Sequence, residues 1–171
     1  MSSQGRSEVV YEGRVIAVRV DTIEGEDGSS FRRDVVQHPG AVAVVPLTGD
    51  GQVVMVTQYR HPVGEWLLEI PAGTLEEGED PDWCAARELE EETGYTAASM
   101  RRLFSMYMAP GYCTELLHVY VAEGLQPGDA RPDDDERIEV TAVPLGDVVG
   151  MVRDGRIRDA KTIAALMTLG R

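Results

Sequence analysis

The segment from Asp80 to Gly94 constrains the fold of this chain most, because it carries the signals of a helix at both ends. Asp80 can cap the first helical turn, and Pro81 suits the first helical position. Gly94 stands where helices commonly end in a residue of left-handed conformation. The sequence therefore predicts a helix over residues 81–93.

Strand-like runs lie on both sides of this helix. Turn signals at residues 26–29 and 48–52 predict two hairpins ahead of it. The runs of strand character cover residues 9–23, 31–38, 41–47, 53–58, 66–70, 103–108, 116–121 and 138–143. The tail from Leu145 predicts two helices, and Asp159 suits the cap of the second one. Together these elements predict a mixed α+β fold.

Composition narrows the class of protein. The chain has 171 residues, of which 43% are hydrophobic and 27% charged, as in an ordinary globular domain. A net charge of -14 argues against a nucleic-acid partner, and an anionic substrate would need cations between it and the protein. There is no apolar stretch of about 18 residues and no signal peptide. With only two cysteines, we expect a cytoplasmic protein without membrane association.

Three carboxylates share one side of the predicted helix. At about 100° per residue, Glu88, Glu91 and Glu92 fall within one arc. Each like-charge pair costs a few tenths of a kcal/mol, roughly, in an isolated helix. Bound divalent cations would turn that repulsion into attraction, since hard cations prefer oxygen ligands. The competing interpretation of such a helix is a solvated acidic face.

The spacing around the helix resembles the Nudix box. Gly73 is followed by Glu79, then by Arg87-Glu88-Leu89, Glu91-Glu92 and Gly94, with Tyr95 at a position that is usually aliphatic. The resemblance implies an α/β/α Nudix sandwich with a mixed sheet. It implies that Glu88, Glu91 and Glu92 hold two or three Mg²⁺ or Mn²⁺ ions, with the carbonyl of Ala72 as a further ligand. In this family Glu79 and Arg87 are more often structural, and Arg87 and Glu91 form an i,i+4 pair.

The flanking segments resemble the ADP-ribose pyrophosphatase branch of that family. They are residues 58–60, 69–73 and 110–115. Residues 1–38 are similar to the extra N-terminal antiparallel β subdomain of that branch, which leaves 39–171 as the Nudix hydrolase domain. In relatives this subdomain is exchanged between protomers and completes the partner's substrate site, so the resemblance implies a homodimer.

The resemblance also implies substrate contacts. Arg60 is expected to bind the diphosphate, because a guanidinium suits bidentate phosphate binding. Arg32 and Arg33 would reach the substrate of a partner protomer, and Glu115 would bind a ribose. The competing interpretations are a surface arginine at position 60, a solubilising strand-edge pair at 32 and 33, and a residue without contact to substrate at 115.

Hydrolysis also needs a base that activates water. In this branch it is commonly a glutamate of a late loop, in a Glu-x-Glu pattern. Aligning Ile138-Glu139-Val140 with the strand start puts Asp134 at the base position and Glu136 at the second acidic position. Aspartate is one methylene shorter than glutamate, so Glu136 and Glu139 stay open as alternatives, as does a solvated acidic loop.

The predicted function is hydrolysis of ADP-ribose to AMP and ribose 5-phosphate with Mg²⁺ or Mn²⁺. One alternative is a hydrolase of another nucleoside diphosphate sugar such as GDP-mannose, since those enzymes share several flanking motifs. The alternative from another class is a non-catalytic ADP-ribose-binding regulator. Such proteins usually have degraded boxes, whereas Glu88, Glu91 and Glu92 are all present here.

Overall fold

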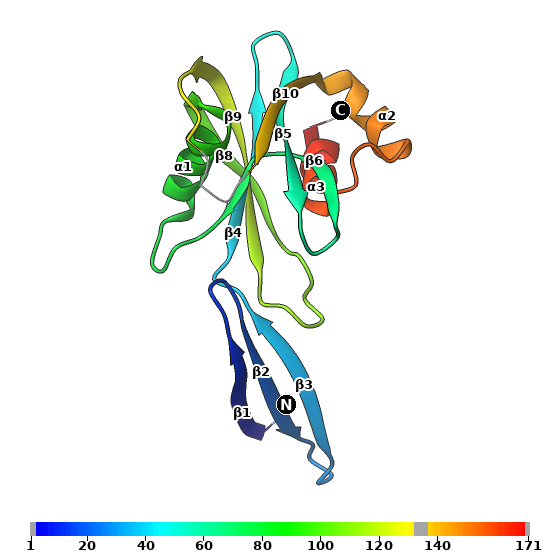
Figure 1. The fold of residues 1–171 in the computed structure, drawn as a ribbon. Helices are drawn as coiled ribbons and strands as arrows, with labels where there is room; N and C mark the ends of the chain where they lie inside the picture. Colours follow the sequence, from blue (N-terminus) through cyan, green and yellow to red (C-terminus); the bar gives the residue numbers. More distant parts are fainter. Residues whose placement is uncertain (1–2, 132–136, 170–171) are drawn as a thin grey trace. The chain divides into compact units, whose positions relative to one another are not determined.

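The computed structural model describes residues 3–131 and 137–169, and the chain divides into two compact units (Figure 1). One unit comprises Met1–Gly40 and Met106–Leu117, and the other comprises Ala41–Ser105 and His118–Arg171. Residues 106–117 join the N-terminal unit through backbone bonds: Val36 N–H donates to the carbonyl of Tyr112 at 2.7 Å, and Thr114 N–H donates to that of Val36 at 2.9 Å. The predicted domain boundary at residue 38 stays a prediction.

The N-terminal unit is built on a three-stranded antiparallel sheet in the order β1-β2-β3. The strands are β1 (Ser3–Glu12), β2 (Ala17–Glu24) and β3 (Ser30–Gln37). A single run over residues 9–23 is therefore wrong, because a tight turn breaks it where Gly13 N–H donates to the carbonyl of Ile16 at 2.9 Å. Val15 and Ile16 have strand propensity and hide this turn from the sequence pattern.

The second unit carries the larger sheet, in which the main order is β10-β5-β4-β9-β8, with β6 paired to β5 and β7 paired to β4. The strands are β4 (Ala41–Leu47), β5 (Gln52–Arg60), β6 (Glu65–Glu69), β7 (Ala72–Thr74), β8 (Tyr95–Tyr107), β9 (Leu116–Pro127) and β10 (Ile138–Pro144). The helices are α1 (Pro81–Thr93), η1 (Leu145–Asp147), α2 (Val148–Arg153) and α3 (Ala160–Leu169).

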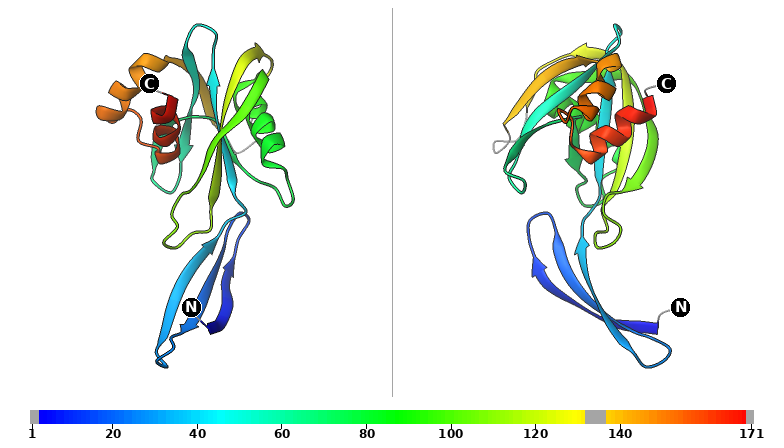
Figure 2. Two further views of the ribbon diagram at one scale, coloured as in Figure 1. Left: turned by 180° about the vertical axis from the view of Figure 1, so that it is seen from behind. Right: turned by 90° about the vertical axis from the view of Figure 1, so that its right-hand side faces the viewer.

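Helix α1 lies on one side of this sheet, and α2 and α3 lie on the other, as the two views of Figure 2 show. The predicted α/β/α sandwich, preceded in the chain by an antiparallel β subdomain, is thus confirmed, and the structure shows that this subdomain has three strands. The core between α1 and the sheet consists of buried side chains from α1, β4 and β9: Val42, Val44, Cys84, Ala85, Leu89, Tyr120 and Ala122. This packing fixes which side of α1 faces the strands.

Both predicted ends of α1 are confirmed. The Asp80 carboxylate accepts the N–H of Asp82 at 2.8 Å, and Pro81 takes the first position. Gly94 has φ 75° and donates its N–H to the carbonyl of Glu90 at 2.8 Å. A side chain at Gly94 would also meet the backbone of Ala130 at 2.8 Å, so a glycine is needed there for conformation and for space.

Candidate functional site

The carboxylate of Glu88 is packed directly against the backbone of β7. A Cβ added at Gly73 would stand 1.9 Å from Glu88 Cδ, so the space of a side chain at 73 is filled by the glutamate. The Glu88 side chain is 13% exposed. The box glycine, which lies within strand β7, is therefore needed for space: it lets the carboxylate of the helix reach the strand backbone.

Glu92 is held by the same strand. Its side chain is buried, and Ala72 N–H donates to Glu92 Oε2 at 3.0 Å. A buried carboxylate is costly unless it is hydrogen-bonded, so this amide fixes and stabilises the charged group. Strand β7 thus positions two of the three box carboxylates, Glu88 and Glu92. The predicted role of the Ala72 carbonyl as a metal ligand stays a prediction.

Arg87 joins the remaining acidic residues of the box. Its Nε donates to Glu79 Oε1 at 3.0 Å, and its Nη1 donates to Glu91 Oε2 at 2.7 Å and lies 2.8 Å from Glu88 Oε1. The expected Arg87–Glu91 pair is thus present. Burial lowers the pKa of Arg87, but the hydrogen bonds to Glu79 and Glu91 and the charge of Glu88 outweigh it and raise that pKa. Arg87 offsets part of the repulsion between Glu88 and Glu91.

The chemistry of these donors suits a hard cation, because they are carboxylate oxygens beside a strand backbone. Residues 3–131 and 137–169 contain no preformed cluster of three or more His, Cys, Asp or Glu side chains able to hold a metal. Instead Glu88 and Glu91 contact Arg87, and Glu92 contacts Ala72. A carboxylate has two oxygens with several lone pairs, so each of these groups can keep such a partner and still offer an oxygen to a cation.

Arg60, predicted as a diphosphate ligand, is bound by a buried carboxylate. Its Nε and Nη2 donate to Glu69 Oε1 at 2.8 Å and Oε2 at 2.7 Å. Lys161 Nζ donates to the same Glu69 Oε2, and Asp159 Oδ2 lies 3.1 Å from Lys161 Nζ. The expected cap of α3 is present too, since Asp159 Oδ2 accepts the N–H of Thr162 at 2.9 Å. Sequence reasoning missed the contacts of Glu69 and Lys161, for which no spacing signal exists.

Arg60 also lies within the electrostatic reach of Glu92 on α1. The hydrogen bonds to Glu69 are the main cause that raises the pKa of Arg60, and the charges of Glu92 and Asp159 add to it. The Arg60 side chain is 38% exposed. The Arg60 side chain therefore remains partly accessible to a ligand.

The other predicted substrate residues belong to the N-terminal unit. Arg32 and Arg33 are exposed neighbours on β3, so their side chains point to opposite faces of the sheet. Arg33 Nη1 donates to the carbonyl of Arg32 at 3.0 Å, and its guanidinium lies 6.0 Å from the Phe31 ring centre. Glu115 is partly buried, and its N–H donates to Cys113 Sγ at 3.5 Å.

The predicted base residues Asp134 and Glu136 lie outside the described residues. The third candidate, Glu139, is an exposed residue of β10 and is in register with Thr57 of β5. The segment that leads toward them is fixed to α1, because Arg131 N–H donates to the carbonyl of Glu91 at 2.8 Å. The chain thus passes the end of α1 just ahead of the acidic stretch.

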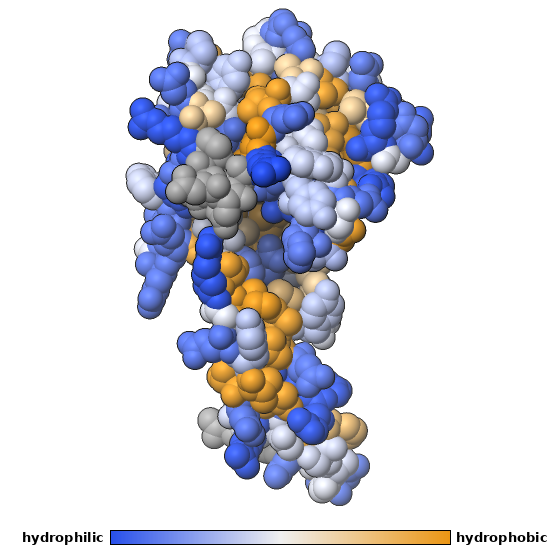
Figure 3. Space-filling model, viewed as in Figure 1, coloured by the Kyte–Doolittle hydropathy of each residue, from blue (hydrophilic) through white to orange (hydrophobic). Residues whose placement is uncertain are grey.

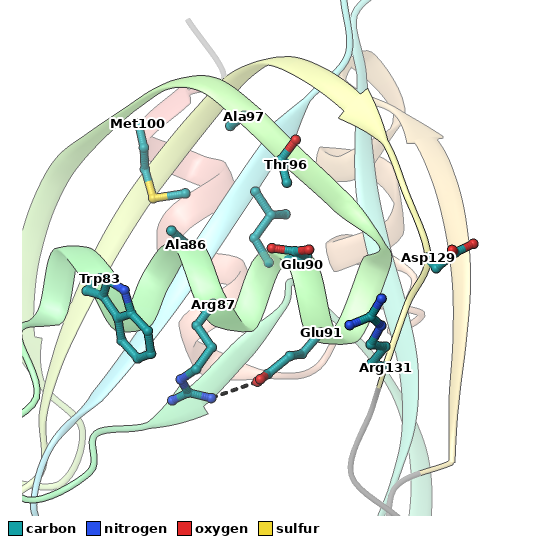
Figure 4. Close-up of a pocket in the computed structure, with 11 residues that line it drawn as sticks. Trp83, Ala86, Arg87, Glu90, Glu91, Thr96, Ala97, Met100, Asp129 and Arg131 are labelled. Carbon is teal, nitrogen blue, oxygen red and sulfur yellow. Dashed lines mark hydrogen bonds and ion pairs between the residues drawn. The ribbon is translucent and has the colours of Figure 1, made fainter.

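A cavity of about 440 Å³ lies beside α1 (Figure 4). Ala86, Ala97 and Met100 supply apolar lining, Trp83 stands at one end, and Arg131 at the other. The guanidinium of Arg87 lies 5.8 Å from the Trp83 ring centre. Helix α1 therefore presents two different sides: Glu88 and Glu92 face β7, whereas the cavity lies along Glu90 and Glu91.

No helix among the described residues is long and apolar enough to cross a membrane.

Comparison with known proteins supports the assignment of the box. The model of the NUDIX domain matches residues 37–166. A crystal structure of an ADP compounds hydrolase superposes with a TM-score of 0.86 at 24% identity and covers 98% of this chain and 91% of that chain. That structural likeness shows the fold.

Three curated relatives have different names. The chain is 42% identical over 166 residues to a methanol dehydrogenase activator of Bacillus methanolicus (96% of this chain, 90% of that protein). It is 42% identical over 164 residues to an ADP-ribose pyrophosphatase of Bacillus subtilis (95% of this chain, 89% of that protein). It is 37% identical over 155 residues to a GDP-mannose pyrophosphatase of Yersinia pestis (85% and 77%).

Proposed function

Since this chain belongs to the NUDIX domain family, we propose that it is a metal-dependent hydrolase that cleaves ADP-ribose into AMP and ribose 5-phosphate. The observation that carries the hydrolase activity is the fixation of Glu88 and Glu92 against β7, through the space at Gly73 and the N–H of Ala72. The choice of ADP-ribose is supported by the 42% identity to an ADP-ribose pyrophosphatase over 95% of the chain.

Glu88, Glu91 and Glu92, with the carbonyl of Ala72, would hold two or three Mg²⁺ or Mn²⁺ ions. Such ions neutralise the diphosphate and lower the pKa of bound water. The net charge of -14 is then compatible with an anionic substrate. Arg87 helps in this set because it holds Glu91 and Glu88 near each other before any cation arrives.

The reaction adds water across the diphosphate. One P–O bond of the bridge breaks, the water oxygen bonds to one phosphorus, and the bridging oxygen leaves on the other product. Arg60 binds the diphosphate as a charged hydrogen-bond donor. Asp134, or Glu136 or Glu139 in its place, takes the proton of the attacking water.

The protein is proposed to act in the cytoplasm as a homodimer in which residues 1–38 cross to the partner. The sheet of the N-terminal unit supports a dimer, because Val9, Tyr11 and Phe31 on it are 56%, 57% and 48% exposed. Figure 3 shows apolar residues gathered over the sheet of β1, β2 and β3. Arg32 or Arg33 would then contact the partner's substrate diphosphate, and Glu115 a ribose.

Two other functions compete with this one. The 37% identity to a GDP-mannose pyrophosphatase favours a different nucleoside diphosphate sugar. The name of the relative from Bacillus methanolicus fits a regulator, but a non-catalytic role would leave the fixation of Glu88 and Glu92 without a purpose.

A substrate panel distinguishes these functions. The purified protein is incubated with ADP-ribose, GDP-mannose and other nucleoside diphosphate sugars, each with Mg²⁺, with Mn²⁺ and with a chelator. Chromatography then measures the released nucleotide and sugar phosphate. We expect AMP and ribose 5-phosphate in equal amounts, with the highest kcat/KM for ADP-ribose and none in chelator. A higher kcat/KM for GDP-mannose than for ADP-ribose would make GDP-mannose the assigned substrate. The absence of product from every compound would overturn the proposed hydrolase activity.

A further inference from the structure

Glu69, at the end of β6, is a nearly fully buried carboxylate that binds cations from two distant elements. Its side chain is 1% exposed. Arg60 comes from β5, and Lys161 comes from the first turn of α3, 92 residues away along the chain. Burial raises the pKa of Glu69, but the bonds and charges of Arg60 and Lys161 outweigh it and lower that pKa. Glu69 is therefore a fixed anionic centre between two cations.

The geometry of the Arg60–Glu69 pair determines which part of the guanidinium is occupied. The two bonds use Nε and Nη2, which form one edge of the planar group. The Nη1 donors lie away from that edge, and the side chain is 38% exposed. Glu69 thus fixes the orientation of Arg60 without using all its donors. An arginine held in this way loses less side-chain entropy when it binds an anion.

Lys161 in turn secures Glu69 through α3. Thr162, the next residue, is fully buried and its hydroxyl accepts the N–H of Ile70 at 3.0 Å. The same hydroxyl donates to Asp159 Oδ2 at 2.6 Å. The first turn of α3 is therefore bonded to the residue that follows Glu69. Two residues later, Ala72 N–H holds Glu92.

A second ion pair joins the same parts of the chain without this burial. Glu65, at the start of β6, pairs with Arg158 just ahead of α3. Their side chains are 48% and 53% exposed. Glu65 is the register neighbour of Arg60 across β5 and β6, so removing its charge tests the loss of a nearby exposed carboxylate without the loss of the bonds between Glu69 and Arg60. It is the matched control for the buried cluster.

We propose that Glu69 is a positioning residue for diphosphate binding, which holds the guanidinium of Arg60 in one orientation, and that Lys161 holds Glu69 in place. This rests on the proposed function in its choice of ligand, a nucleoside diphosphate linked to a sugar, and in the role of Arg60 as the residue that binds the diphosphate. Glu69 itself touches no substrate and acts through Arg60.

A double-mutant cycle tests the proposal. We expect Glu69→Gln to raise KM for ADP-ribose by at least ~10-fold with a much smaller change of kcat, as for lost ground-state binding. In an Arg60→Gln background the same substitution should leave KM unchanged, because residues that act through one another are not additive. Lys161→Met should raise KM in the same direction, and Glu65→Gln should leave both constants at the wild-type values.

Glu69→Asp covers the case in which Glu69→Gln does not fold, because it keeps the charge and withdraws the carboxylate from Arg60 by one methylene. It should also raise KM. Three results would overturn the proposal. They are additive effects of the Arg60 and Glu69 substitutions on KM, a loss of kcat with an unchanged KM, and a wild-type KM in both Glu69 variants.

A binding measurement separates this proposal from the proposed function. The dissociation constant of a non-hydrolysable α,β-methylene analogue of ADP-ribose is measured by calorimetry with Mg²⁺ on the same variants. If the wild type binds the analogue but releases no product from ADP-ribose, the proposed function fails. The positioning role is still supported if Glu69→Gln raises the Kd of the analogue and has no further effect in the Arg60→Gln background. If the wild type does not bind the analogue, or Glu69→Gln binds it equally well, the positioning role is wrong.

Discussion

The carboxylate of Glu88 occupies the space that a side chain on Gly73 would need, since a Cβ at 73 would lie 1.9 Å from Glu88 Cδ. This contact joins the first and the middle positions of the box through space. It explains why a glycine is needed at a position whose backbone has no left-handed conformation. The space between β7 and α1 at this point therefore accommodates the Glu88 carboxylate but no additional side chain at position 73.

Gly73→Ala should consequently displace Glu88 and lower kcat by roughly 10²-fold, the effect of about a 1 Å misplacement of a reacting group. Circular dichroism should show an intact fold. Gly150→Ala is the control, because a Cβ at Gly150 meets nothing within 4 Å and its activity should equal that of the wild type. Full activity of Gly73→Ala would show that Glu88 does not need its position on β7.

Glu92→Gln should lower kcat by at least ~10²-fold and leave the fold intact, because one ligand charge is lost from the proposed metal site. The amide oxygen of glutamine can still accept the N–H of Ala72, so little stability should be lost. Glu90→Gln, an exposed position on the same helix, is the control. The measurement is the steady-state rate of each variant at saturating Mg²⁺. A near wild-type kcat for Glu92→Gln would show that Glu92 is not part of the metal site.

Asp134→Asn should lower kcat by at least ~10²-fold with little change of KM, because a general base acts in the transition state. Glu136→Gln and Glu139→Gln are measured beside it. A large loss in either of these, with a mild effect of Asp134→Asn, would move the base to that residue. Mild effects in all three would show that these carboxylates do not serve as the base.

The N-terminal sheet should mediate a homodimer. Sedimentation at micromolar concentration should give a dimer for the wild type. Val9→Asp should shift it toward monomer, because it places a charge in the exposed apolar part of β1. Val63→Asp serves as the control, because Val63 is 59% exposed in the other unit. A wild-type monomer with full activity would contradict both the dimer and the roles of Arg32 and Arg33.

The ion pair of Glu79 with Arg87 should make stability depend on acid pH. Burial raises the pKa of Glu79, but the hydrogen bonds from Arg87 and from the backbone outweigh it and lower that pKa. A lowered pKa stabilises the folded state above the ordinary value of about 4.3 and loses that effect as pH falls through the folded value. Thermal unfolding of wild type and Glu79→Gln should therefore differ by about 1–3 kcal/mol at neutral pH and converge below about pH 4. If the free energies of unfolding of the wild type and Glu79→Gln differ by the same amount at every pH, the effect of the substitution is due to packing rather than to the charge of Glu79.

The helix and the strands around it could be predicted because their signals are local. The cap at Asp80, the proline at 81 and the left-handed Gly94 each depend on a few neighbouring residues. The run over residues 9–23 was predicted wrongly for the same reason: Val15 and Ile16 continue the strand pattern through a turn that only a backbone bond from Gly13 reveals. Local propensity does not record which backbone groups pair.

By itself, the sequence determined the box, its helix and the residue types able to bind a cation, since these follow from composition and spacing within one segment. Only the tertiary structure decided how each carboxylate is held. The contact of Glu88 with Gly73 needs β7 packed on α1, and the Glu69 cluster needs α3 brought to β6. Lys161 and Glu69 are 92 residues apart, and no periodicity links positions so distant. Their pairing exists because the folded sheet buries one carboxylate, and a buried charge is stable only with a partner.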